Sequence, residues 1–281
     1  MTLTHTPPTD VAAQAVQIVA FRTAHLPGAL RLSQQAGWPH RMDDWGLNAA
    51  VSQGVAAVAG DRVVGTALCT VFGPVALLNM IIVDKAMRGQ GLGRRLMEVA
   101  MAHAGPREMR LVATAEGIPL YEKLAFAACG MIRQHQGLAQ SAAPALPVTS
   151  GGMEDIASLA VMDRNATGLE RETVLRLVAR QGKVLLAERG FALLRDFGSG
   201  RVVGPVVARD AETAKALIAE AARRTAGSFL RIDLPRAHGL DDFVTALGLA
   251  HVGGGTVMAR NAVPAPQGDY TAFALASQAL G

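Results

Sequence analysis

The stretch VDKAMRGQGLGRRLMEVAMAHA, residues 83–104, places three glycines within five positions, where an apolar strand should give way to a helix. The preceding run, residues 75–83 (VALLNMIIV), has the length and the β-branched content of a buried strand. From residue 92 onward, apolar and small residues recur at helical spacing. Glycine in a helix's first turn costs about 0.5–1 kcal/mol relative to alanine. These glycines therefore indicate a tight turn or a ligand that approaches the backbone.

Two common glycine-loop motifs do not fit this spacing. A P-loop ends in Gly-Lys-Ser/Thr, whereas Gly93 is followed by Arg94 and Arg95. The dinucleotide fingerprint is G-x-G-x-x-G with an acidic residue about 20 positions later, and neither feature is present. The remaining interpretation is a pyrophosphate clamp, in which backbone N–H groups and a helix N-terminus point at phosphate oxygens. Arg88 and Arg94 would add charged donors to that clamp.

Around this junction the sequence predicts a mixed α/β unit. Strands are predicted at residues 16–22, 55–60, 62–73, 75–83, 107–114 and 128–134. Helices are predicted at residues 27–36, after or within the loop at 37–46, from residue 92, and at 117–126. Residues 134–149, rich in Ala, Ser, Gln and Pro, are interpreted as an interdomain linker with the next strand at its end.

The second half of the chain repeats the order of the first. Two helices, three strands, a helix, a strand, a helix and a strand are predicted between residues 153 and 261. The block KLAF (123–126) aligns with ALGL (246–249), each closing a helix before a strand. We therefore expect two domains, at residues 1–137 and 138–281.

Two motifs of the first half resemble those of the GCN5-related N-acetyltransferases (GNAT family). Val83 followed by RGQGLG (88–93) and a helix is similar to that family's acetyl-CoA-binding motif. TAEGIPLYEKLAF (114–126) is similar to its next motif, with four residues in register, Leu120, Tyr121, Leu124 and Phe126. Three residues depart from the usual Asn, Ala and Gly, namely Thr114, Gly117 and Ala125. The resemblance covers about residues 16–136.

The second half resembles the same fold more distantly. Its strand-to-helix junction, Val207 to Asp210, has no glycines and leads into a helix capped by Asp210. Val244 stands at the position of Tyr121. We interpret this half as a non-catalytic GNAT-like domain. Its tail, which carries Tyr270 and Phe273, is expected to fold back and cap the acceptor cleft.

The resemblance implies a tandem α/β fold, each domain a mixed sheet flanked by helices, and an acyltransferase that moves the acetyl group of acetyl-CoA to a small-molecule amine by direct attack. It implies cofactor binding by Ile81, Ile82, Val83, Arg88, Gly89, Gln90, Gly91, Leu92, Gly93, Arg94 and Thr114. Tyr121 would protonate the leaving thiolate, because a tyrosine pKa near 10 lies close to a thiol pKa of about 8.5. A backbone N–H near Ile81 is the candidate donor to the thioester oxygen.

The acceptor side of the site is less determined by sequence. His40, in the stretch GWPHRMDDW with Asp43 and Asp44, is a candidate general base or a surface histidine. Asn79 either pairs with a neighbouring strand or faces the substrate. The two tryptophans, Trp38 and Trp45, line the acceptor pocket or anchor the helices. A sensor that binds acyl-CoA without turnover is the alternative function.

Composition limits the other possibilities. The 281 residues carry a formal net charge of +4 and no dense basic tract, which does not favour nucleic acid as a partner. Apolar runs stay shorter than about 18 residues, so no membrane span is expected. The first residues lack the features of a signal peptide, and we expect a cytoplasmic protein. The histidines and cysteines show no metal-ligand spacing, so no metal is expected. A homo-oligomer is compatible with the sequence.

Overall fold

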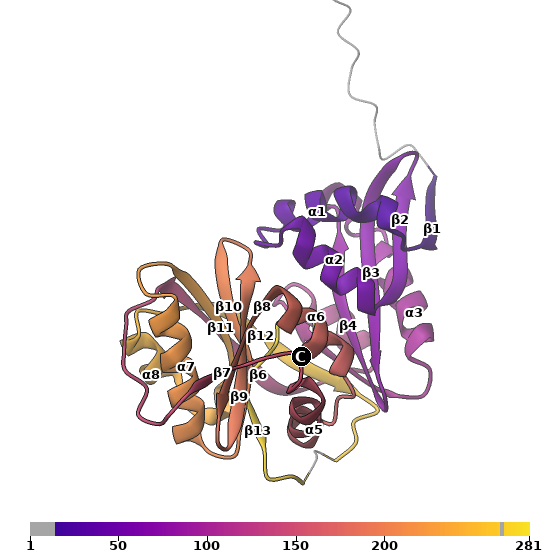
Figure 1. Cartoon of the computed structure of the whole chain (residues 1–281). Coiled ribbons are helices and arrows are strands. Elements are labelled where there is room, and N and C mark those ends of the chain that lie inside the picture. The colour runs from indigo at the N-terminus through magenta and orange to yellow at the C-terminus, as the bar shows by residue number, and fades with distance from the viewer. Residues whose placement is uncertain (1–14, 265–266) are drawn as a thin grey trace, which may run out of the picture.

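The computed structural model describes residues 15–264 and 267–281, and its strands form one mixed sheet of 13 strands flanked by helices (Figure 1). In the N-terminal half, alternate residues of the sheet pack on opposite faces. Ala57 and Val64 contact the helix that follows the glycines, whereas Ala56 and Val63 contact the first helix of the chain. None of the helices in the described part of the chain is long and apolar enough to span a bilayer.

The elements of the first half are β1 (Val16–Ala20), η2 (Thr23–His25), α1 (Leu26–Gln35), α2 (Met42–Val51), β2 (Gln53–Ala59), β3 (Arg62–Phe72), β4 (Val75–Val83), η3 (Lys85–Met87), α3 (Leu92–Ala104), β5 (Glu108–Ala113), α4 (Ile118–Lys123) and β6 (Ala127–Leu138). Those of the second half are β7 (Thr149–Gly151), α5 (Ile156–Thr167), α6 (Glu172–Gln181), β8 (Gly182–Ala187), β9 (Gly190–Phe197), β10 (Gly200–Ala208), α7 (Ala211–Arg224), β11 (Phe229–Pro235), η4 (Arg236–His238), α8 (Asp241–Ala246), β12 (Ala250–Arg260) and β13 (Thr271–Ala274).

This order confirms the predicted repeat, since β1 through β6 recur as β7 through β12 with the same helices between them. The linker expected at residues 134–149 is wrong in its first part. Residues 134–138 continue β6, and they pair with β11 and β12. Polar composition suggested a loop there, but a strand with neighbours on both edges satisfies its backbone whatever its side chains are. The sequence also gave no signal for β13.

The two halves exchange their last strands. The sheet order is β1-β2-β3-β4-β5-β12-β6-β11-β10-β9-β8-β7, so β12 of the second half pairs with β5 of the first. Reciprocally, β6 of the first half pairs with β11 of the second. The sheet is therefore continuous across residues 137 and 138, and the division of the chain into two domains at that point stays a prediction.

Strands β4 and β5 separate after a short contact. They run parallel only where residues 75–77 face residues 108–110, while β12 pairs with the opposite edge of β5 at residues 109–113. A β-bulge follows in β4, where Met80 and Ile81 together lie opposite Ala67 of β3, and Met80 has a φ of 50°. The bulge turns the end of β4 away from β5 and leaves its last residues with a free edge toward the glycine loop.

Strand β10 repeats this geometry with a different outcome. It has the same length as β4, pairs with β11 over two residue pairs, and shifts register against β9 between Val203 and Val206. Beyond that shift, its edge is taken by the chain itself, since Val206–Ala208 pairs antiparallel with Thr271–Ala274 of β13. The opening that β4 leaves free is closed in the second half.

The turns after α4 and α8 also match. The N–H groups of Ala125 and Phe126 donate to the carbonyls of Glu122 and Tyr121, and those of Gly248 and Leu249 donate in the same pattern to Thr245 and Val244. Both turns need a left-handed residue, with φ of 62° at Ala125 and 84° at Gly248. The first half thus places alanine where the turn favours glycine.

Replacing Ala125 with glycine should stabilise the protein. Alanine in the left-handed region costs about 1–2 kcal/mol, and glycine removes this strain from the folded state. The greater freedom of glycine in the unfolded chain offsets about 0.5–1 kcal/mol of the gain in stability. We expect Ala125→Gly to raise the free energy of unfolding by about 0.5–1 kcal/mol in chemical denaturation.

Gly248→Ala is the matched variant at the same turn of the second half, where a Cβ would lie 2.6 Å from the Leu138 carbonyl oxygen. It should destabilise the protein by at least about 1 kcal/mol. An Ala125→Gly protein less stable than the parent would contradict the assignment of strain to this turn.

Candidate active site

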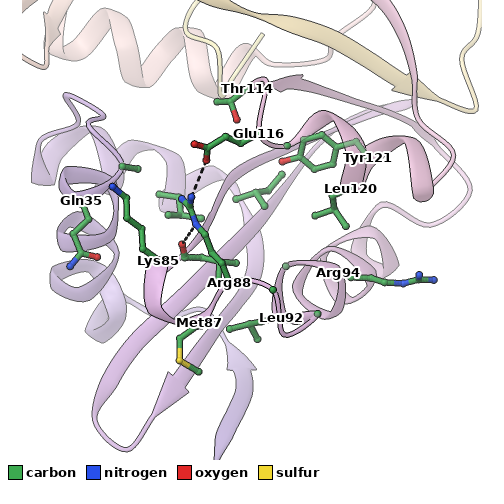
Figure 2. Close-up of a pocket in the computed structure, with 18 of the residues that line it drawn as sticks. Gln35, Lys85, Met87, Arg88, Leu92, Arg94, Thr114, Glu116, Leu120 and Tyr121 are labelled. Atoms are coloured by element: carbon green, nitrogen blue, oxygen red, sulfur yellow. Dashed lines mark hydrogen bonds and ion pairs between the residues drawn. The ribbon is translucent and has the colours of Figure 1, made fainter. Parts of the chain in front are cut away.

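The glycine loop opens onto a cleft of about 680 Å³, which we call the glycine-loop cleft. Its walls come from the end of β4, η3, the N-terminus of α3, the β5–α4 loop and the end of α1 (Figure 2). Eleven residues singled out from the sequence line it, namely Ile81, Ile82, Val83, Arg88, Gly89, Gly91, Leu92, Gly93, Arg94, Thr114 and Tyr121. Gln90 is exposed and is not part of the lining.

The three glycines serve different purposes. Gly89 and Gly91 have φ of 78° and 75°, the left-handed region that favours glycine, and Gly91 is the N-cap of α3. A Cβ at either position would meet no protein atom within 4 Å, so the space beside them is open to a ligand. Gly93 has an ordinary backbone, and a Cβ there would make ordinary contacts at 3.4 Å with Leu120 and 3.6 Å with Val83. The turn requires the first two glycines and tolerates alanine at the third.

Charged side chains surround the mouth of the glycine-loop cleft. The Arg88 guanidinium lies across it and donates to Glu116 at 3.0 Å and to the Val83 carbonyl at 3.3 Å (Figure 2). Arg94, in contrast, points away from the cleft and donates to Glu98 on the outer face of α3 at 2.8 Å. Lys85 also lines the cleft, although its position in the sequence gave no indication of this. The cleft is therefore a cationic surface with exposed backbone.

A second cavity of about 250 Å³, the inner cavity, adjoins this cleft. Both are lined by Trp38, Ile81, Thr114 and Tyr121, so they meet beside the bulge of β4. Gln134 of β6, in the first half, also lines the inner cavity. So do residues of the second half that no local sequence pattern brings to this place: Phe197 of β9, Arg231 of β11, Gly254 of β12, and Ser277, Gln278 and Ala279 of the C-terminal segment.

The C-terminal segment does return to the cavity, but its aromatic residues do not line it. Tyr270 lies beneath the guanidinium of Arg209, and Phe273 packs in the core of the second half. The wall is made by the residues after β13, which the buried Arg171 holds by donating to the Leu280 carbonyl at 2.6 Å and to Asp163 at 2.7 and 2.8 Å. Backbone hydrogen bonds rather than aromatic contacts thus fix this wall.

Tyr121 stands at the junction of the two cavities (Figure 2). Its side chain is 7 % exposed, and burial raises the pKa of its hydroxyl to about 12. The ring packs against Gly117, where a Cβ would come within 2.7 Å of the ring and 3.4 Å of the hydroxyl oxygen. The departure from alanine at position 117 therefore has a physical reason, because only glycine leaves room for the tyrosine in this position.

His40 lines the inner cavity and packs edge-on against Phe197, with ring centroids 5.4 Å apart. Its pKa is lowered to about 4 by desolvation on burial, which the nearby Asp44 opposes and Arg231 and Arg195 reinforce. Its Nδ1 atom is sealed from solvent and has no hydrogen-bond partner among the described residues. The ring is therefore neutral at physiological pH.

Asn79 both pairs with its neighbours and lines the inner cavity. Its amide nitrogen donates to the Thr70 hydroxyl at 2.9 Å, which holds the side chain against β3. Its carbonyl oxygen is buried without a partner in the part of the chain described here. A buried polar atom without a partner costs about 1–3 kcal/mol, so an incoming N–H donor would gain a strong hydrogen bond.

The tryptophans divide between the two roles considered from sequence. Trp45 is fully buried, stacks on Phe21, and donates from its indole to Ser33 at 3.1 Å, so it anchors the helices. Trp38 lines both cavities. Asp44 is also structural: it is buried and accepts from Arg41 and, across the two halves, from Arg195 at 3.2 Å. Among residues 15–264 and 267–281, no cluster of acidic, histidine and cysteine side chains could hold a metal ion.

Comparisons with known proteins agree with this arrangement. Residues 52–128 and residues 159–274 match two family models, each described as an acetyltransferase (GNAT) domain. The uncharacterized N-acetyltransferase YitH of Bacillus subtilis is 30 % identical over 284 residues, which cover 94 % of this chain and 98 % of the relative.

Solved structures share the fold over the whole length. A crystal structure from Pyrococcus horikoshii superimposes with a TM-score of 0.82 at 18 % identity, covering 99 % of this chain and 100 % of that one. A tandem GNAT protein from the clavulanic acid biosynthesis pathway gives a TM-score of 0.61 at 12 % identity, covering 89 % of this chain and 100 % of that one. At these identities the likeness concerns the fold alone.

Substitution of the glycines should separate their roles. Valine at position 91 would have to adopt a φ of 75°, which disfavours a β-branched residue and distorts the loop. We expect Gly91→Val to weaken acetyl-CoA binding by about tenfold or more, and Gly93→Ala to change it by less than about threefold, in isothermal titration calorimetry.

Melting temperatures measured in parallel would show whether either variant disturbs the fold. Retention of the parental affinity by Gly91→Val, within about twofold, would contradict a role for this loop in binding the cofactor.

The buried neutral His40 should make stability depend on pH. Its pKa in the fold, about 4, lies below that of the unfolded chain, so the unfolded state binds the extra proton first as the pH falls. The stabilisation is complete above about pH 6.5 and is lost between about pH 6.5 and 4, by up to about 3 kcal/mol. Denaturation at pH 7.5 and 4.5 should show a smaller loss for His40→Gln than for the parent, and equal losses would contradict the assignment.

Proposed function

This chain belongs to the GNAT acetyltransferase family, and we propose that it transfers the acetyl group of acetyl-CoA to the amine of a small molecule by direct attack. The observation that carries this proposal is the junction of the two cavities at Ile81, Thr114 and Tyr121. A cofactor in the glycine-loop cleft and an amine in the inner cavity would meet there, with a buried hydroxyl beside them.

We place the pantetheine arm of the cofactor along the free edge of β4. Pantetheine is an amide chain that can pair with a strand, and Ile81–Val83 lines the cleft beyond the bulge. Residues 80 and 81 share one partner on β3, so backbone groups of the bulge are available to other acceptors. We propose that a backbone N–H of this bulge donates a hydrogen bond to the thioester oxygen.

The second half differs from the first at each of the corresponding positions, which supports a non-catalytic role for it. The edge of β10 that corresponds to Ile81–Val83 is occupied by β13, so a pantetheine arm would have to displace a strand. The helix that follows is capped by the Asp210 carboxylate, which accepts from the Thr213 N–H at 2.8 Å, and an anion would be repelled from this end. Val244 stands fully buried where the first half has Tyr121.

In the proposed reaction the neutral amine attacks the thioester carbonyl carbon and forms the new C–N bond. The C–S bond breaks, its electron pair stays on sulfur, and the amine's proton is released. Burial raises the pKa of Tyr121 to about 12, which keeps the hydroxyl protonated but makes it a weaker acid than free tyrosine. Its main contribution is therefore a hydrogen bond to the developing thiolate, with proton transfer completed as solvent enters.

The lowered pKa of His40 does not favour its role as general base, because a group with a pKa of about 4 holds a proton poorly at neutral pH. The carbonyl oxygen of Asn79 has no partner among the described residues but is sealed from solvent, so it becomes an acceptor for the amine only when the side chain turns into the inner cavity. We propose that Asn79 orients the attacking nitrogen and that the proton leaves through water.

The inner cavity favours a small acceptor over a protein. Its volume of about 250 Å³ is enclosed by the α1–α2 loop on one side and by β9 and the C-terminal segment on the other. A polypeptide chain would need an open groove on both sides of the reacting amine. The second half of the chain therefore supplies the walls that restrict the acceptor.

Removing the Tyr121 hydroxyl should slow the chemical step selectively. We expect Tyr121→Phe to lower kcat by about 100-fold in an assay of thiol release, while the Kd for acetyl-CoA stays within about twofold. The only other tyrosine, Tyr270, lies outside both cavities, and Tyr270→Phe is the matched control with unchanged kcat.

A panel of amines tests the function itself. Acetyl-CoA binding without accelerated thiol release by any amine would favour a sensor that binds acyl-CoA over an enzyme.

A further inference from the structure

The inner cavity continues outward into a third cavity of about 190 Å³, which we call the outer cavity. The two share Gly37, Pro39, Gln134, Phe197 and Arg231. Together they form one path from the junction beside Tyr121 to the seam between β6, β9 and β11. An acceptor that fills the inner cavity would thus extend its far end toward Arg231.

The charges along this path have one sign. None of the described residues that line the inner or outer cavity is an aspartate or a glutamate. The one charged side chain in both linings is that of Arg231, since His40 is neutral. An acceptor with a second cationic group, such as a polyamine or an aminoglycoside, would find no carboxylate to pair with. The path therefore discriminates against polycations.

Arg231 is held rigidly and keeps part of its donor set free. It is 6 % exposed, and its Nε and Nη2 atoms donate to Asp233 at 3.1 and 2.9 Å. Its guanidinium carbon also lies 5.1 Å from the centroid of the Phe197 ring, so the guanidinium packs over this ring. Nη1 donates to no acceptor among the described residues and is not sealed from the cavities. Arg231 thus brings two uncommitted N–H groups to cavities whose described lining contains no aspartate or glutamate.

We infer that the acceptor amine carries a carboxylate, which the free Nη1 group of Arg231 binds while the amine lies beside Tyr121. This inference rests on the proposed acetyl transfer and names its substrate class as amino acids. A guanidinium already fixed by Asp233 and Phe197 loses little side-chain freedom on binding, and charge-assisted hydrogen bonds in a buried site are strong. Gln278, whose amide nitrogen donates to Asp233 at 2.9 Å, adds no negative charge to the path.

Matched pairs of acceptors test this inference on the full chain. α-Amino acids and ω-amino acids of increasing length are each compared with their carboxamides in the thiol-release assay. A carboxamide lowers the pKa of its amine, so rates are compared at equal concentrations of neutral amine. We expect at least one acid to exceed its amide in kcat/KM by about tenfold or more, a difference expressed in KM.

Variants identify the group responsible. Arg231→Lys keeps a positive charge beside Asp233 but removes the second donor nitrogen, and we expect it to reduce the acid-to-amide ratio by about tenfold with little change for the amide. Arg195→Lys is the matched control, because Arg195 is equally buried, lies 5.1 Å from the same Phe197 ring and lines neither cavity. Its ratio should equal that of the parent.

The outcomes separate this inference from the proposed function. Faster acetylation of amides or diamines than of acids, or a ratio that Arg231→Lys leaves unchanged, would overturn the carboxylate assignment and leave acetyl transfer standing. If no amine is acetylated, the proposed function fails. Calorimetry with N-acetyl amino acids and their amides in the presence of coenzyme A then decides the carboxylate assignment, and equal affinities would overturn it.

Discussion

The separation of β4 from β5 is the constraint on which the rest of this structure depends. A parallel pair that ends after three residue pairs leaves strand edges without partners, and unpaired backbone groups are costly when buried. The bulge at Met80 and Ile81 turns this edge toward the glycine loop, where a ligand with amide groups can satisfy it. The left-handed glycines 89 and 91 then bring the α3 N-terminus to the same opening. The fold and the glycine-loop cleft are two results of one interruption in a sheet.

The second half meets the same constraint without a ligand. Its β10 carries the corresponding register shift, and β13 pairs with the exposed edge. The residues that follow β13 then cross to the first half and line the inner cavity. The exchange of β6 and β12 brings Gln134 and Gly254 to the same place. The second half thus closes the opening beside its own β10 and also supplies walls of the inner cavity.

The local signals in the sequence predicted most of the fold and most of the residues that line the glycine-loop cleft, because a glycine turn, a buried strand and a helix register act within a few residues. The ten-element repeat and the positions of Gly91 and Tyr121 followed from these signals. The exchange of strands could not be predicted from these signals, because the sequence patterns of β6 and β12 would be the same whichever half each strand completes. Arg231 is separated from Tyr121 by 110 positions, and no local pattern marks it. His40 was recognised, but its neutrality depends on Arg231 and Arg195, which only the fold brings near it.

The ion pair at the mouth of the glycine-loop cleft is exposed and therefore weak. Arg88 forms an ion pair with Glu116 across the opening, and both side chains are exposed, 42 % and 78 %. Exposed pairs of this kind contribute about 0–1 kcal/mol, because water screens them and two flexible side chains must be ordered. A pyrophosphate that accepts from Arg88 and from the backbone of the loop offers stronger, charge-assisted hydrogen bonds. Glu116 would therefore compete only weakly for Arg88 with the pyrophosphate that we propose for this cleft.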